Sequence, residues 1–265
     1  SRRNTRRHHA RKRLSQMAAI PKRRLDQILV ERGLAESRSR AQALVMAGLV
    51  YSETKRLDKA GTQIPVNMPL ELKGQDHPWV SRGGLKLDHG LDHFQFDVTG
   101  ATCLDVGAST GGFTDVLLSR GAAKVYAVDV GHGQLAWKIR NDERVIVMER
   151  TNARHISQQD VPDDINFICC DASFIGLQTV LPAALGLATD GAKLIALIKP
   201  QFEVGKDQVG KKGVVRDPVL HQEVCDRIST WLEGLPGWHV AGIEKSPITG
   251  PEGNIEFLIA AQYKK

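Results

Sequence analysis

The 265-residue chain contains no run of about 18 apolar residues, so the sequence offers no candidate for a membrane-spanning helix. No short apolar stretch follows the basic start of the chain, which argues against a secretory signal in this sequence. We therefore expect a cytoplasmic protein without a membrane partner. Aromatic residues are scarce at 5%, but a hydrophobic fraction of 42% is enough to bury the cores of one or two domains.

Cysteines are also few, and no two of the four are spaced as a C-x-x-C pair. A zinc site or a redox motif would show such spacing, and a disulfide framework is typical of small secreted domains. We expect Cys103, Cys169, Cys170 and Cys225 to be small buried hydrophobic residues in a reducing compartment, and we expect no bound metal.

Acidic residues are absent from residues 1–24, which hold ten lysines and arginines. The formal net charge of +6 comes from this tail, because residues 25–265 carry 26 basic and 30 acidic side chains, a net charge of −4. An arginine-rich tail without acids is typical of a disordered end, of a targeting remnant, or of an arm that neutralises phosphates. Composition alone does not separate these three interpretations of residues 1–21.

Residues 22–76 predict a small α+β domain. Apolar residues at helical spacing from Leu25 predict a first helix that ends at Gly33. A second helix begins after Ser37, a residue type that caps helix N-termini, and ends at Gly48. Short strand patterns separated by turns follow in LVYSETKRLDKAGTQI and PLELK.

After a bridge at residues 77–82, strand-like and helical patterns alternate to the end of the chain. This alternation predicts an α/β domain over residues 83–265, with a doubly wound and largely parallel sheet. The predicted strands cover residues 103–106, 124–130, 144–149, 165–171, 192–200, 238–246 and 255–263. The predicted helices cover residues 111–121, 132–140, 177–188 and 218–235.

The segment CLDVGASTGGFTDVLL at 103–118 predicts a buried strand, a glycine-rich turn and a helix. Glycines there allow close backbone approach to a ligand at the helix N-terminus. Asp129 ends the next predicted strand, 22 residues beyond Gly107, which is about the spacing of a carboxylate that binds ribose hydroxyls. The pattern resembles the S-adenosylmethionine site of Rossmann-like methyltransferases. The candidate cofactor-binding residues are Asp105, Gly107, Ser109, Gly111, Gly112, Phe113 and Asp129, although Phe113 also suits the core.

The same turn satisfies G-x-S-x-G, the pattern of the nucleophile elbow in serine hydrolases. In that interpretation Ser109 attacks an acyl carbonyl, and His155, His221 or His239 would be its base. His221 falls in a predicted helix and His239 in a predicted strand, and the turn follows the first strand of its domain. These features favour the nucleotide site over the hydrolase.

Four ionisable residues lie near the ends of predicted elements of the sheet: Lys86, Asp171, Lys199 and Glu256. Charged groups at the carboxyl edge of a parallel sheet lie where such sheets bind ligands. Each residue alone is equally typical of a surface charge. Together they indicate a catalytic group.

The ordered set of Lys86, Asp171, Lys199 and Glu256 resembles the K-D-K-E tetrad of FtsJ-like RNA ribose 2′-O-methyltransferases. With VSRGGLKL, LDVGASTGGFTD, DASFI and KPQFEVG, the chain resembles the TlyA family of rRNA methyltransferases over residues 22–263. That family joins an RNA-binding domain like that of ribosomal protein S-four (the αL motif) to an FtsJ-like domain. In the bridge, His77 stands where the family pattern leads us to expect a basic first residue.

The resemblance implies an S-adenosylmethionine-dependent enzyme that methylates ribose 2′-hydroxyls of cytidine in large-subunit and also small-subunit rRNA. Its partners would be ribosomal RNA or ribosomal subunits, and the oligomeric state stays open. The basic residues that the resemblance and the charge pattern assign to RNA contact are Arg24, Arg38, Arg40, Lys206, Lys211, Lys212 and Arg216. A solvated loop is an equal interpretation of the last four.

Two further functions stay open: a membrane-lytic protein, because members of the family often carry a haemolysin label, and a non-catalytic rRNA-binding assembly factor. For the enzyme, a sugar hydroxyl must lose its proton as it attacks a sulfonium methyl. A lysine can accept that proton only if its pKa is lowered, as a second nearby lysine would do, and otherwise its ammonium can stabilise the alkoxide. By family analogy Lys199 has one of these roles, with Asp171 as its partner.

Overall fold

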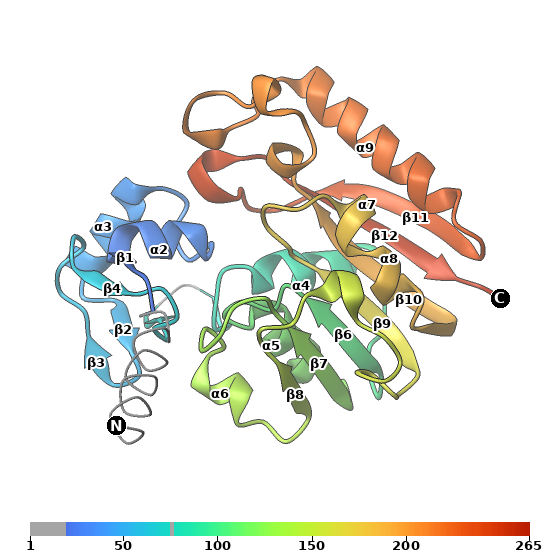
Figure 1. The fold of residues 1–265 in the computed structure, drawn as a ribbon, viewed down its shortest axis with the longest axis horizontal. Coiled ribbons are helices and arrows are strands. Elements are labelled where there is room, and N and C mark those ends of the chain that lie inside the picture. Colours follow the sequence, from blue (N-terminus) through green and yellow to red (C-terminus); the bar gives the residue numbers. More distant parts are fainter. Residues whose placement is uncertain (1–19, 75–76) are drawn as a thin grey trace, which may run out of the picture.

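The structure is a computed structural model that describes residues 20–74 and 77–265. Almost all of the basic tail predicted at residues 1–21 lies outside these ranges. The described chain forms a small N-terminal module, drawn in blue in Figure 1, and a larger domain built around one sheet.

The N-terminal module contains two helices and two small sheets. Its elements are β1 (Lys22–Arg24), α2 (Leu25–Glu31), α3 (Arg38–Met46), β2 (Val50–Ser52), β3 (Lys55–Arg56), β4 (Gln63–Pro65) and β5 (Glu71–Leu72). β1 pairs with β4, and β2 pairs with both β3 and β5, all antiparallel. Both predicted helices are confirmed, and the Ser37 hydroxyl accepts a hydrogen bond from the Arg40 amide at 3.1 Å. β1 was not predicted, because three polar basic residues carry no strand pattern.

The larger domain has a seven-stranded sheet in the order β11-β12-β10-β9-β6-β7-β8. The strands are β6 (Thr102–Val106), β7 (Lys124–Val128), β8 (Val145–Met148), β9 (Ile165–Cys170), β10 (Ala188–Ile198), β11 (Trp238–Lys245) and β12 (Phe257–Tyr263). β10, β9, β6, β7 and β8 are parallel, whereas β12 runs antiparallel to both β10 and β11. The predicted α/β class and all seven strand positions are confirmed.

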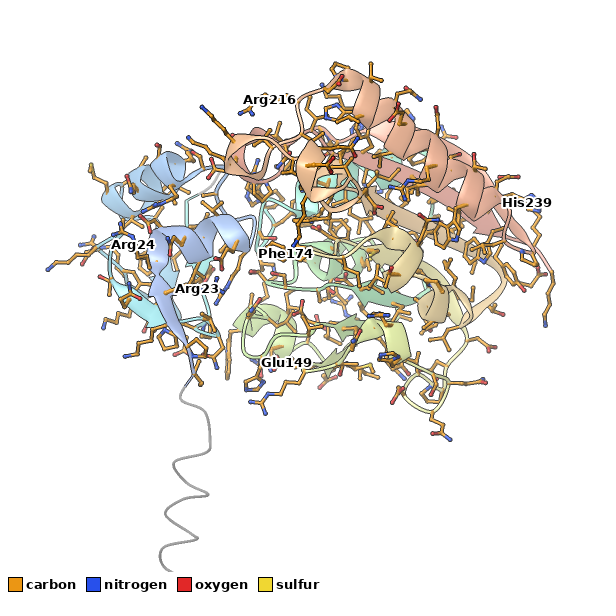
Figure 2. The ribbon with its side chains drawn as sticks, turned by 45° about the horizontal axis from the view of Figure 1, so that its top comes forward. Arg23, Arg24, Glu149, Phe174, Arg216 and His239 are labelled. Carbon is orange, nitrogen blue, oxygen red and sulfur yellow. The ribbon has the colours of Figure 1, made fainter. Side chains whose placement is uncertain are left out.

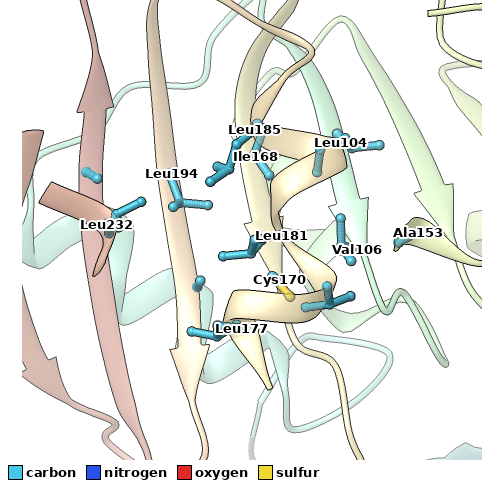
Figure 3. Close-up of a cluster of buried hydrophobic side chains, with 14 of the residues drawn as sticks. Leu104, Val106, Ala153, Ile168, Cys170, Leu177, Leu181, Leu185, Leu194 and Leu232 are labelled. Carbon is cyan, nitrogen blue, oxygen red and sulfur yellow. The ribbon is translucent and has the colours of Figure 1, made fainter. Parts of the chain in front are cut away.

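Helices cover both faces of this sheet (Figure 1). α4 (Gly84–His93), α5 (Gly112–Ser119) and α6 (Trp137–Arg140) cover one face, and α7 (Leu177–Val180), α8 (Pro182–Leu185) and α9 (Pro218–Glu233) cover the other. Along β9, Ile168 and Cys170 enter the core beneath α7–α9, shown in Figure 3, and Phe167 and Cys169 enter the opposite core. This alternation follows from the two-residue period of a strand.

Three helices differ from the sequence prediction. α4 was missed, because its two glycines weaken the helical pattern and packing against the sheet stabilises it instead. The helix predicted at 132–140 is reduced to the four residues of α6. The helix predicted at 177–188 is divided into α7 and α8, since Pro182 begins a new helix and cannot continue the previous one.

All four cysteines are buried and free, as predicted. Burial raises the pKa of Cys170 to about 12, and the Asp171 carboxylate adds to this shift. These thiols therefore behave as small hydrophobic residues.

Candidate functional site

The loop between β6 and α5 packs closely against the rest of the chain. Gly107 has a φ of +80°, and a Cβ at this position would come within 2.5 Å of the Asp171 carbonyl oxygen. A Cβ on Gly112 would meet the Ser81 hydroxyl. Close packing against the chain's own atoms therefore requires glycine at both positions, and the predicted approach to a ligand stays a prediction.

Asp129 holds this loop from the end of β7. Its carboxylate accepts hydrogen bonds at 2.7 Å from the Ser109 amide and at 2.7 Å from the Gly131 amide. Ser109 has a φ of +50°, a left-handed conformation that the first of these bonds supports. The acidic residue predicted to bind a ribose thus lies beside the glycine loop, as the spacing required.

A cavity of about 400 Å³ opens beside Gly107 and Asp129, a volume within the usual range for small-molecule sites. Asn152 and Ala153 line it after β8, and the Asn152 side chain also caps the short turn that follows. The N-terminal module provides part of the opposite wall: Arg23, Ile28, Glu31, Arg32 and Val66. A glycine loop, a carboxylate and apolar walls fit an adenosyl ligand.

Two predicted cofactor-binding residues do not line this cavity or the one next to it. Asp105 is fully buried beneath the loop, where the Thr114 hydroxyl donates a 2.7 Å hydrogen bond to its carboxylate. Gly111, with a φ of +103°, lies against Leu135 and Ile139 and serves the turn. Gly112 and Phe113 reach an adjoining smaller cavity, and Phe113 is otherwise part of the core.

Asp105 should make stability depend on pH. Burial raises its pKa to about 7, with the Thr114 hydrogen bond opposing this shift. Because the folded-state pKa lies above the unfolded value, the stability from protonated Asp105 is complete below pH ~3.8 and is lost as the pH rises through ~7. Asp105→Asn keeps the Thr114 hydrogen bond without the charge. We expect its melting temperature relative to the parent protein to rise by roughly 5 °C between pH 5 and pH 8. A difference independent of pH would contradict this.

The four predicted catalytic residues meet at the edge of the sheet as two ion pairs. Lys86 Nζ on α4 lies 2.6 Å from Glu256 Oε1, just before β12. Lys199 Nζ, directly after β10, bonds Asp171 Oδ1, directly after β9. Lys86, Asp171 and Lys199 line one small cavity together with Gly107 and Ser109. The tetrad therefore adjoins the glycine loop.

Each lysine of the tetrad is paired with a carboxylate, Lys86 with Glu256 and Lys199 with Asp171. The second pairing influences the protonation state of Lys199. Burial alone would lower the pKa of Lys199, but Asp171 and Glu256 outweigh burial and raise this pKa. Burial alone would raise the pKa of Asp171, but the ammonium groups of Lys199 and Lys86 lower it. Of the two roles left open for Lys199, this raised pKa favours stabilisation of an alkoxide by the ammonium over acceptance of a proton. Lys199 is a cation suited to stabilise negative charge on an oxygen.

Sequence reasoning missed three residues around the tetrad. The Ser173 hydroxyl lies 3.2 Å from Lys199 Nζ, and Gln201 Nε2 donates to Glu256 Oε2 at 3.1 Å. Phe174, labelled in Figure 2, has a φ of +63°, is 79% exposed and lines the larger cavity, to which residues of the N-terminal module also contribute. All three lie in the motifs DASFI and KPQFEVG. These motifs indicated that the segments matter for function, but not what Ser173, Phe174 and Gln201 contact.

The hydrolase interpretation lacks its histidine among the described residues. His221 is buried, with its Nε2 2.7 Å from the Val215 carbonyl oxygen. His239 lies at the far end of β11 from the loop (Figure 2). No hydrogen bond joins Ser109 to a histidine within residues 20–74 and 77–265, so the predicted triad does not form there.

The predicted RNA-binding residues form two groups, and all of them are exposed except the half-buried Arg24. In the N-terminal module, Arg24 and Arg38 lie 2.9 and 3.7 Å from the buried Asp26 carboxylate, and Arg40 is exposed. The other group lies on the loop between β10 and α9, where all four side chains are exposed: Lys206, Lys211, Lys212 and Arg216. The two parts of the protein are joined by an ion pair of 2.7 Å between Arg82 and Glu36.

Comparison with known proteins matches this architecture. Residues 79–263 match the model of the FtsJ-like methyltransferase family, and residues 23–70 match the S4 domain. The chain is 47% identical over 237 residues to the 16S/23S rRNA (cytidine-2′-O)-methyltransferase TlyA of Mycobacterium tuberculosis, covering 89% of this chain and 88% of that protein. The chain belongs to the TlyA family. The resemblance found in the sequence motifs is thereby confirmed.

Other TlyA relatives carry a different name. The chain is 39% identical over 236 residues to Hemolysin A of Brachyspira hyodysenteriae, covering 89% of this chain and 98% of that protein. A solved structure from Streptococcus thermophilus superposes with a TM-score of 0.78 at 43% identity, covering 93% of this chain and 90% of that one. Within the described residues, none of the helices has both the length and the apolar character needed to cross a membrane.

Proposed function

We propose that this protein transfers a methyl group from S-adenosylmethionine to the ribose 2′-hydroxyl of a cytidine in ribosomal RNA. The observation that carries this proposal is the tetrad of two lysine–carboxylate pairs beside the glycine loop and its cavity. The substrate follows that of the M. tuberculosis relative, which is named for cytidine in 16S and 23S rRNA. A ribosomal substrate supports a cytoplasmic site of action.

The donor supplies an electrophilic methyl on its sulfonium, so this chain has to position and activate the ribose oxygen. Gly107, Ser109 and Asp129 line the larger cavity and would hold the donor there, beside the tetrad. The Lys199 ammonium stabilises the negative charge that develops on the 2′-oxygen as this oxygen gives its proton to solvent and takes the methyl, while the sulfur–methyl bond breaks and S-adenosylhomocysteine is released. Asp171 keeps Lys199 charged and oriented. Lys86, paired with Glu256, lines the same small cavity.

Phe174 suits the base of the target nucleotide. An exposed aromatic ring held in a left-handed backbone conformation, 4.9 Å from the Phe202 ring, is ready to stack on an unpaired base. The ribose can reach Lys199 only if the nucleotide leaves its helix, and an aromatic surface compensates the stacking that it loses. Phe174 is thus positioned to hold a flipped cytidine.

The basic loop between β10 and α9 should contact RNA phosphates. Each neutralised phosphate contributes about −0.7 to −0.9 to the slope of log affinity against log salt concentration. We expect the double variant Lys211→Gln, Lys212→Gln to reduce the size of that slope by about 1.5 in filter-binding titrations. Lys264→Gln with Lys265→Gln, at the exposed C-terminal end, is the control and should leave the slope unchanged. Equal slopes for both double variants would mean that the loop is only solvated.

A methyl-transfer assay tests the function as a whole. Purified protein is incubated with donor carrying a tritiated methyl and with ribosomal subunits or naked rRNA, and label in RNA is counted. The proposal predicts label that blocks alkaline cleavage at one ribose. RNA and donor binding without label would identify a non-catalytic assembly factor. Ester cleavage that Ser109→Ala abolishes would identify a hydrolase, and leakage of liposomes would identify a lytic protein.

A further inference from the structure

We propose that the protein also binds one divalent transition-metal ion, with Zn²⁺ as the typical case, through His89, His93 and Glu244. This site lies outside the tetrad and the donor cavity, and it does not depend on the proposed function. His89 and His93 belong to the C-terminal half of α4, and Glu244 belongs to the edge strand β11. Within the chain that the structure describes, no other group of three such side chains converges in this way.

Helical spacing brings the two histidines to one face. They are four residues apart, so their side chains lie one turn above each other, and their rings stack with centroids 6.0 Å apart. The His93 ring also packs edge-on against Phe94 at 4.8 Å, which fixes its direction. Two imidazoles four residues apart on one helix face are a typical metal-binding pair.

Glu244 completes the group from the neighbouring strand. Its Oε2 lies 2.9 Å from His93 Nε2, and its Oε1 lies 3.7 Å from His89 Nε2. Ligands bound to Zn²⁺ at about 2.0–2.1 Å in a tetrahedron lie about 3.3 Å from one another. The ligand atoms of the three residues all lie within 4.8 Å of one another, so small side-chain rotations are enough to reach this geometry.

The ligand types select the class of ion. Imidazole nitrogen binds Zn²⁺, Cu²⁺ and Ni²⁺ well, whereas Mg²⁺ and Ca²⁺ prefer sites made of oxygen. The three side chains are between 30% and 43% exposed, so an ion can enter from solvent and a water can fill the fourth position. Two histidines and one carboxylate with an open position form a common zinc ligand set.

The position in the fold indicates a structural effect. The N-terminal half of α4 carries Lys86 against Glu256, and its C-terminal half carries the two histidines against β11. An ion bound by His89, His93 and Glu244 would join α4 to the edge strand β11. Because an ion that binds only the folded state stabilises it, the melting temperature should rise with ion concentration.

The test uses the full chain without a histidine tag and with His8→Ala and His9→Ala, because an adjacent histidine pair in the tail would also bind metal. Titration calorimetry with ZnCl₂ should give one ion per chain, and excess ZnCl₂ should raise the melting temperature by several degrees. His93→Ala and Glu244→Gln should each weaken binding at least tenfold and remove most of that rise. His239→Ala, which removes an exposed histidine elsewhere on β11, should change neither result.

Stability without metal separates loss of the site from damage to the fold, so each variant is also melted in chelator. A variant that melts as the parent does in chelator but no longer responds to ZnCl₂ supports the site. The absence of one-to-one binding in the parent would overturn the proposal. So would binding that His93→Ala and Glu244→Gln leave unchanged, since the cluster would then be only a histidine–carboxylate ion pair.

Discussion

Replacing Lys199 by alanine should lower the rate of methyl transfer by about 100- to 1,000-fold while donor affinity stays within threefold. Loss of one preorganised group that stabilises a developing oxyanion typically has an effect of this size. Lys199 bonds Asp171 at the tetrad and lines the small cavity there, but it is not among the residues that line the larger donor cavity. Single-turnover transfer to rRNA measures the rate, and calorimetry with S-adenosylhomocysteine measures donor-site affinity.

Two further variants make this prediction specific. Lys193→Ala removes a lysine from the middle of the same strand, beside the Phe96 ring, and should leave transfer unchanged. Lys199→Ala leaves the half-buried Asp171 carboxylate without its ion-pair partner, which destabilises the fold. Adding Asp171→Asn should restore stability but not activity. Retention of more than a tenth of the activity by Lys199→Ala would remove Lys199 from the catalytic role.

Gly107→Ala should weaken donor binding more than tenfold and lower the free energy of unfolding by about 2–4 kcal/mol. A left-handed backbone costs alanine about 1–2 kcal/mol, and the new Cβ would also lie 2.5 Å from the Asp171 carbonyl oxygen. The loop must then move away from β9, which displaces both the donor cavity and the residue that pairs with Lys199.

Gly191→Ala is the matched control. Gly191 has a φ of +81°, nearly the same as Gly107, but a Cβ there would meet nothing within 4 Å. This variant carries the backbone cost alone, so we expect a loss of about 1–2 kcal/mol and unchanged donor affinity. Denaturant unfolding and calorimetry on both variants separate the cost of the left-handed backbone from the effect of the contact with Asp171. Equal effects of both substitutions on donor affinity would show that the contact with Asp171 is unimportant.

Much of this fold follows from local patterns. Alternation of apolar strands with helical segments determined the class, because a strand buried on both faces is almost entirely apolar, as INFICC is in β9 apart from Asn166. The sequence did not predict the elements that depend on contacts with distant parts of the chain. β1 consists of Lys22, Arg23 and Arg24, and it is a strand because β4 pairs with it. α4 contains two glycines and is stabilised by packing on the sheet.

The sequence predicted which four residues belong to the catalytic site. Which lysine pairs with which carboxylate could be seen only in the structure. Strand-end location brought Asp171 and Lys199 together, since the carboxyl ends of adjacent parallel strands meet at one edge. Sequence spacing could not show that Glu256, 170 residues away, pairs with Lys86. Nor could it show that Asp105 is buried below the loop while Asp129 lines the cavity. The charge state of Lys199 depends on these pairings.

The most direct test of the central claim is to identify the methylated nucleoside. rRNA from subunits methylated by the purified protein is digested to nucleosides and analysed by mass spectrometry. The account predicts 2′-O-methylcytidine in the parent sample and about one-hundredth of that amount or less with Lys199→Ala after the same short incubation. A methyl group on a base, or a yield of 2′-O-methylcytidine with Lys199→Ala above a tenth of the parent's, would contradict it.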